Sequence, residues 1–154
     1  MQRSFLYWFL LLLVMVGIAY FSFEAGFFDY IWHIDSSKLC FVILTLFTIA
    51  YLKLGQLCFV YDYKGKRIEL NDLDLGYEAA DMSMALGMLG TVIGFIVMSS
   101  SFTSIDFSNI ENIKDLFKLA TSGMSTALYT TAFGLVSNIV LRAVYFLFQK
   151  DLGL

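Results

Sequence analysis

The sequence has no proline, only two cysteines and one histidine, and charged residues make up only 15% of its 154 residues. Without proline, no helix has an obvious kink point. Cys40 and Cys58 fall about five turns apart on one predicted helix, where no disulfide can join them, and we interpret them as small apolar fillers. His33 has no second histidine with which to form a metal site, and we interpret it as an interface anchor. We therefore expect no metal and no cofactor.

The shortage of charge excludes further classes of protein. The net charge is only -3, and the basic residues lie at the borders of apolar segments instead of on one face, so no nucleic-acid partner is expected. No nucleophile with a base, no metal-ligand cluster and no phosphate-binding loop can be assembled from the polar residues. We therefore do not expect an enzyme.

Apolar residues, in contrast, make up 59% of the chain. Four apolar runs, at approximately residues 5–23, 39–61, 82–102 and 122–148, approach or exceed the ~20 residues that span a bilayer. The first run is longer than the apolar part of a signal peptide and has no small-residue cleavage site, so it is predicted to be an uncleaved helix. The expected fold class is an all-α membrane protein with four transmembrane helices, in a single membrane domain over residues 1–154.

The basic residues predict the orientation. Seven of the ten lie on the side of the two termini and of the loop 62–81, which makes these parts cytoplasmic and puts the loops 24–38 and 103–121 outside. The inner loop pairs basic with acidic residues, and both a solvated helical extension and a contact site for a cytoplasmic partner remain open. In the outer loop, a capping box at Ser108 precedes apolar residues at helical spacing, which predicts a short outer amphipathic helix.

Glycine and hydroxyl residues are concentrated in the third and fourth runs. In hydrocarbon, such residues mark either a packed helix interface or a wet pathway. Because an intramembrane asparagine is costly unless it is paired, Asn138 is expected to face protein or water. The small and polar residues that share one face of the third run are Ser83, Gly87, Gly90, Thr91 and Gly94. In the fourth run, one face carries Thr131, Gly134 and Asn138, and the adjoining face carries Thr126, Thr130 and Ser137.

The segments 87–94 and 123–134 resemble the third and fourth helices of the MotA/TolQ/ExbB proton-channel family, the ion-conducting subunits of flagellar stators and of the Ton and Tol systems. The resemblance covers roughly residues 85–140, and the four-span layout is similar to that of the MotA branch. It implies a cyclic homo-oligomer, a pentamer, in a bacterial-type inner membrane. It also implies two copies of a single-span partner whose membrane Asp binds the ion, and an ion-driven rotary motor.

The resemblance also implies residue roles. Carried over by matching position, the ion-pathway residues are Thr91, Thr130 and Thr131. Residues that would line the pore or contact the partner are Thr126, Ser137, Asn138 and Ser83, and those that would allow close helix packing are Gly87, Gly90, Gly94 and Gly134. The transported ion is expected to be H⁺ or Na⁺. Threonine at all three pathway positions is typical of sodium-driven stators and favours Na⁺.

Three features depart from the family pattern. The large cytoplasmic domain that MotA inserts between its second and third spans is reduced to the 20 residues of the loop 62–81. Thr126 stands where ExbB and TolQ carry a glutamate, and the helix-associated prolines of the family are missing. Because hydroxyls alone hold no charge, the carboxylate is expected from the partner. The alternative function is a non-conducting four-helix membrane scaffold or an immunity-type interaction protein, since small residues also hold membrane helices together.

Overall fold

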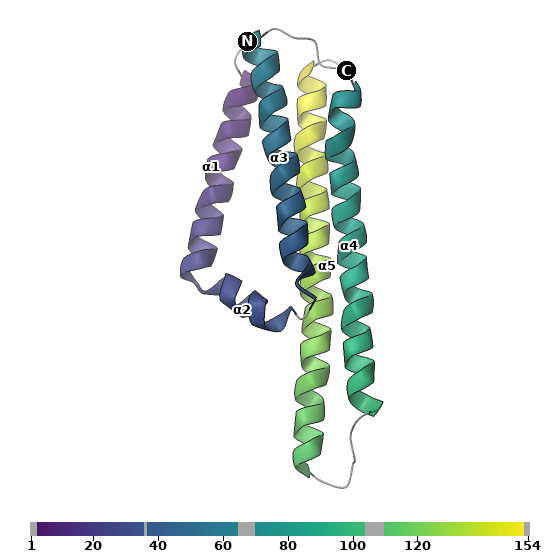
Figure 1. Cartoon of the computed structure of the whole chain (residues 1–154). Helices are drawn as coiled ribbons and strands as arrows, with labels where there is room; N and C mark the ends of the chain where they lie inside the picture. The colour runs from purple at the N-terminus through teal and green to yellow at the C-terminus, as the bar shows by residue number, and fades with distance from the viewer. Residues whose placement is uncertain (1–2, 36, 65–69, 104–109, 153–154) are drawn as a thin grey trace.

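The computed structural model describes residues 3–35, 37–64, 70–103 and 110–152, and the regular structure of these residues is entirely helical. The helices are α1 (Arg3–Glu24), α2 (Phe27–Ile34), α3 (Leu39–Lys64), α4 (Leu70–Thr103) and α5 (Ile110–Leu152) (Figure 1). All of them except α2 are long and apolar enough to cross a bilayer. The predicted all-helical class with four membrane-length helices is therefore confirmed.

The helices α4 and α5 form a long antiparallel pair, against which the other helices pack (Figure 1). α3 lies along this pair and contacts both of its helices, whereas α1 lies on the far side of α3. The first turn of α1 and the last turns of α3 and α5 lie at the same end of the bundle (Figure 1). At the opposite end, the α4–α5 pair extends beyond α3.

The structure corrects the prediction for the outer loop 103–121. The short amphipathic helix expected there is not a separate element, because the described residues from Ile110 onward belong to α5 without a break. This segment contains no proline, so nothing stops the helix of the fourth span from continuing through it, and Leu116 is buried. The capping box at Ser108 lies outside the described residues. The predicted inner loop 62–81 is also largely helical, since α3 continues to Lys64 and α4 begins at Leu70.

The predicted outer loop 24–38 contains the short helix α2, which the sequence patterns did not indicate. Gly26, which precedes it, has a positive φ of 69°, a conformation that glycine adopts without strain. After α2, the buried carboxylate of Asp35 accepts hydrogen bonds from the backbone N–H of Cys40 (3.0 Å) and from the N–H and hydroxyl groups of Ser37. Asp35 therefore satisfies a donor in the first turn of α3 and fixes the corner between α2 and α3.

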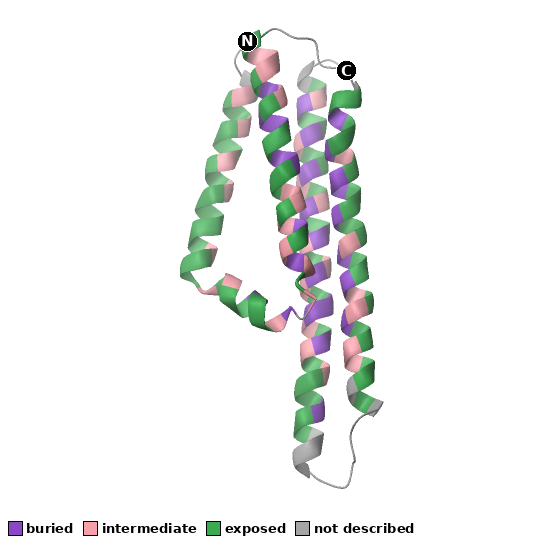
Figure 2. Ribbon diagram, in the orientation of Figure 1, coloured by how far each residue is buried: buried purple, intermediate pink, exposed green. Residues whose placement is uncertain are grey.

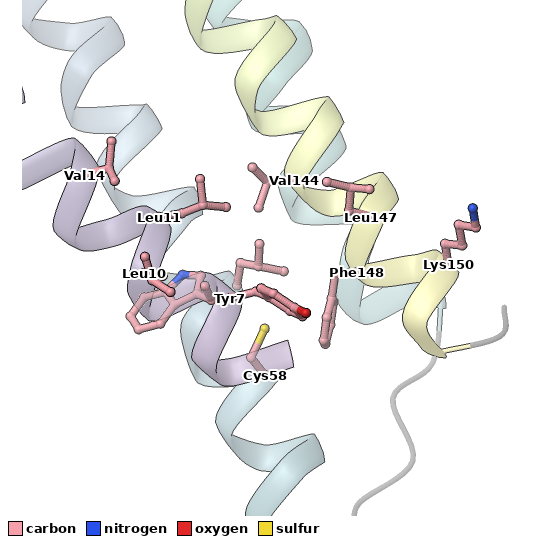
Figure 3. Close-up of a pocket in the computed structure, with 11 residues that line it drawn as sticks. Tyr7, Leu10, Leu11, Val14, Cys58, Val144, Leu147, Phe148 and Lys150 are labelled. Carbon is pink, nitrogen blue, oxygen red and sulfur yellow. The ribbon is translucent and has the colours of Figure 1, made fainter. Parts of the chain in front are cut away.

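The first span, α1, is held mainly at its two ends. Near its start, the backbone N–H of Phe5 donates to the Asp62 carboxylate, and Trp8 and Tyr51 each donate a side-chain hydrogen bond to the other's backbone carbonyl (both 3.1 Å). At its other end, α1 leads into α2. Two apolar grooves of about 660 and 550 Å³ lie along α1, and Figure 3 shows the one that α1 forms with α3 and α5.

The core lies where α3 faces the α4–α5 pair, as the buried positions in Figure 2 show. The hydroxyl of Tyr145 donates to the carbonyl oxygen of Ala50 (2.8 Å), and its ring lies against Gly76, where any Cβ atom would collide with it. Cys58 belongs to this core, and no disulfide joins it to the buried Cys40. The core thus covers one side of the α4–α5 pair and leaves its opposite side open.

Candidate ion pathway

The two glycine-rich segments meet along the contact between α4 and α5, which we call the seam. A Cβ atom added to Gly94 would lie 2.5 Å from the carbonyl oxygen of Gly123 and 2.7 Å from the Cβ atom of Ala127. One added to Gly134 would lie 2.7 Å from the carbonyl oxygen of Ser83. Small residues therefore allow the two backbones to touch. The seam consists of Ser83, Gly87, Gly90 and Gly94 on α4 and of Gly123, Ala127, Thr130 and Gly134 on α5.

Thr130, one of the three predicted pathway residues, lies inside the seam. Its side chain is fully buried and fills the space that the absent side chain of Gly90 leaves. Its hydroxyl donates to the carbonyl oxygens of Thr126 (2.8 Å) and Ala127 (3.1 Å) in its own helix. Within the single chain, Thr130 thus has the surroundings of a packing residue.

Thr91 and Thr131, the other two, lie at one edge of the seam, where both are partly exposed. The hydroxyl of Thr131 donates to the carbonyl oxygen of Ala127 (2.8 Å) and lies 3.5 Å from that of Gly87 across the seam. Thr91 follows Gly87 by one turn of α4, and its hydroxyl donates to the carbonyl oxygen of Met88. Because residues four apart share a helix face, Thr91 and Thr131 belong to the same edge.

The same edge continues to Asn138, Asp81 and Arg142. The amide of Asn138 donates to the backbone carbonyl of Ala80 (2.8 Å), and its nitrogen lies 3.5 Å from a carboxylate oxygen of Asp81. The same oxygen accepts a hydrogen bond from the guanidinium group of Arg142, which forms an ion pair across the seam. Asn138 therefore faces protein and is paired. We call this strip the polar edge; it consists of Thr91, Thr131, Asn138, Asp81 and Arg142.

The other polar residues that were predicted to line the pore do not lie on the polar edge. Thr126 is fully buried, and its hydroxyl donates to the carbonyl oxygen of Ile34 at the end of α2 (2.8 Å). Ser83 is buried in the seam and donates to the carbonyl oxygen of Ala79 (2.8 Å). Ser137 is also buried, with 4% of its surface exposed. In the single chain these three residues are oriented toward neighbouring helices.

Asp81 and Arg142 are members of the edge that sequence reasoning missed. Arg142 was interpreted only as one of the basic residues at the borders of apolar segments, and Asp81 only as one of the acidic residues of the inner loop; the two are 61 residues apart in the chain. One signal was available, because Asn138 and Arg142 are four residues apart and share a helix face. The register that brings Asp81 opposite to them depends on how α4 packs against α5, which the sequence pattern alone does not determine.

The polar edge can coordinate a small cation. Each of its threonine hydroxyls donates its proton to a carbonyl group, which leaves oxygen lone pairs available as ligands. Its one carboxylate, on Asp81, is balanced by Arg142, so the edge has no net charge of its own. Among the described residues, no group of three His, Cys, Asp or Glu side chains could hold a metal ion.

Comparison with known proteins places this site in a family. The model of the MotA/TolQ/ExbB proton channel family matches residues 70–153, a region that includes α4, the seam and the polar edge, and that makes up more than half of the chain. The chain belongs to the MotA/TolQ/ExbB proton channel family. The predicted resemblance is therefore confirmed, and MotA/TolQ/ExbB membership supports an ion-channel role for α4 and α5. No curated protein and no solved structure matches the sequence.

Proposed function

We propose that the chain is the ion-conducting subunit of a rotary motor driven by an ion-motive force, and that the ion passes along the polar edge. The observation that carries this proposal is the placement of Thr91 and Thr131. Both lie within the region that matches the channel family, and both face the side of the α4–α5 pair that α3 leaves open. Because a membrane helix exposed to lipid gains nothing from hydroxyl groups, this edge is expected to face water or a partner.

A second polypeptide completes the proposed pathway. Since Arg142 balances the one carboxylate of the polar edge, we assign the ion-binding carboxylate between Thr91 and Thr131 to a membrane Asp of a single-span partner. Large apolar side chains flank the edge, such as Met88, Leu128 and Phe95, each more than half exposed. Contacts with neighbouring copies and with the partner would cover them. The proposed assembly is a pentamer around two partner copies, in a bacterial-type inner membrane with both termini in the cytoplasm.

The proposed ion is Na⁺ or H⁺. A threonine hydroxyl can coordinate Na⁺ directly, and the two threonines on the polar edge, Thr91 and Thr131, favour Na⁺. Flux measured in Na⁺-free buffer distinguishes the two, because Na⁺-driven transport stops there and H⁺-driven transport continues.

The experiment is ion flux into vesicles that contain the chain together with its copurifying single-span partner. The Thr131→Ala variant is expected to lose most of the flux. Thr45→Ala is the matched control, since Thr45 is an exposed threonine on α3 whose hydroxyl also donates to the carbonyl four residues earlier (2.8 Å). Equal flux in the Thr131→Ala variant and in the unmodified complex would exclude the proposed pathway.

One observation favours the alternative function, a non-conducting four-helix scaffold or immunity-type interaction protein. Thr130 and the glycines of the seam are fully accounted for by helix packing. A scaffold would keep its activity when Thr91 and Thr131 are replaced by valine, which has the same shape, and would lose it when Gly90→Leu separates α4 from α5. Loss of activity in the valine variants, with assembly intact, would exclude the scaffold.

A further inference from the structure

The ion pair between Asp81 and Arg142 lies beside a third polar residue of the polar edge, Asn138. The Asn138 amide donates to the backbone carbonyl of Ala80 on α4, and its nitrogen lies 3.5 Å from a carboxylate oxygen of Asp81, so the carboxylate lies beside the seam. Arg142, one turn further along α5, reaches the same carboxylate oxygen. One oxygen atom is thus shared by an amide and a guanidinium group.

The pair lies at the end of the polar edge that is nearer the start of α1. In the groove between α1 and α5, Tyr7 lies beside Phe148, and Leu11 faces Val144 (Figure 3). Moving along α5 from Phe148 to Val144 therefore corresponds to moving from the start of α1 toward its middle. Arg142 lies two residues before Val144 on α5, and Asp81 directly precedes the third apolar run, 82–102. The pair therefore lies at the border of an apolar run and in line with the threonine hydroxyls, where an ion pathway would end.

The pair is also accessible. The side chain of Asp81 is 61% exposed and that of Arg142 is 51% exposed, on the side of the α4–α5 pair that carries Thr91 and Thr131. An ion pair with this exposure adds little to the stability of a fold. Its accessibility does allow a cation that moves along the edge to reach the carboxylate.

We infer that Asp81 is a second binding station for the transported monovalent cation, with Arg142 as its exchangeable counter-ion. This inference rests on the proposed function. The cation leaves the partner's carboxylate, passes the hydroxyl of Thr91 and then that of Thr131, and displaces the guanidinium group from Asp81. When the cation moves on to the cytoplasm, Arg142 returns to the carboxylate. In the absence of a cation, the guanidinium group occupies the Asp81 carboxylate, so an ion that enters without the partner finds no free carboxylate, and leakage is prevented.

The inference is tested by ion flux through the complex of the chain with its partner, in variants that separate a station from a structural pair. Asp81→Asn is expected to abolish flux, and Arg142→Gln is expected to allow flux when the partner is absent. The exchange of the two charges, Asp81→Arg with Arg142→Asp, is expected not to restore flux, because the carboxylate then lies on the other helix. Glu78→Gln, which neutralises a nearby exposed carboxylate on α4, is the control and is expected to conduct normally.

Each outcome has a defined meaning. If the charge exchange assembles and conducts like the unmodified complex, the pair is structural and the inference is wrong. Failure of both Asp81→Asn and the charge exchange to assemble, judged by size-exclusion chromatography, would likewise assign the pair a structural role and overturn the inference. If Thr131→Ala abolishes flux and Asp81→Asn does not, only the second station is excluded. Absence of any flux through the unmodified complex would instead exclude the proposed function itself.

Discussion

Gly94→Ala is the substitution for which the structure predicts the clearest loss of stability. Its new Cβ atom would lie 2.5 Å from the carbonyl oxygen of Gly123 and 2.8 Å from the backbone nitrogen of Ala127. Ordinary van der Waals contact begins at 3.4 Å, so α4 and α5 have to separate locally by about 0.9 Å (3.4 minus 2.5). No side-chain rotation relieves the overlap with these backbone atoms. The helices themselves must move apart.

The size of the effect follows from a comparison with Gly17→Ala. A Cβ atom at Gly17, in the exposed middle of α1, has no atom within 4 Å. Both substitutions exchange a helical glycine for alanine, which stabilises a helix by about 1 kcal/mol, and this gain cancels between the two variants. The difference between them is therefore the overpacking term at the seam, about 1–3 kcal/mol.

The assay is reversible unfolding of the purified protein by titration with a denaturing detergent, followed by circular dichroism. Gly17→Ala is expected to be at least as stable as the unmodified protein, and Gly94→Ala less stable than Gly17→Ala by about 1–3 kcal/mol. Equal unfolding free energies for the two alanine variants would show that α4 and α5 are not in backbone contact at Gly94, which would refute the packing of the seam.

Two further predictions concern single hydrogen-bonded groups. Asp35→Ala is expected to destabilise the protein by about 0.5–2 kcal/mol in the same assay, because it removes the acceptor for the first turn of α3. The control, Asp29→Ala on the exposed face of α2, is expected to change the unfolding free energy little. Equal effects of the two substitutions would contradict the capping role of Asp35. Tyr145→Phe leaves the carbonyl of Ala50 without its hydroxyl partner and is expected to lower the unfolding free energy by about 1 kcal/mol. Tyr7→Phe, at an exposed tyrosine, serves as the control. An unchanged unfolding free energy for Tyr145→Phe would show that this hydrogen bond contributes nothing to stability.

The parts of the fold that follow from local pattern could be predicted from the sequence. The four apolar runs of bilayer length correspond to four helices that are long enough to span a membrane. The length and hydrophobicity of each run determine by themselves whether it can span, so this part needs no tertiary information. The faces of Gly87, Gly90, Gly94 and Gly134 were also predictable, since helical spacing alone determines them. These residues lie at the contact of α4 with α5.

The parts that depend on tertiary context could not be predicted. The segment 110–121 has the pattern of an amphipathic surface helix, yet it continues the fourth span because no residue interrupts α5. The pairing of Asp81 with Arg142 depends on the register between two helices, which the close approach of their glycines decides. The separation of Thr130, inside the seam, from Thr131, at its edge, depends on the position of the neighbouring helix. Adjacent threonines therefore have different surroundings.

The central claim is that the ion follows the polar edge and not the interior of the seam. The most direct measurement is the labelling rate of single cysteines by a small cationic thiol reagent, in the assembled complex with Cys40 and Cys58 replaced by alanine. Cysteines at positions 91 and 131 are expected to react, with the rate at 131 lowered by the transported cation, and a cysteine at position 130 is expected to remain unlabelled. Rapid labelling at position 130 with none at 131 would contradict the claim.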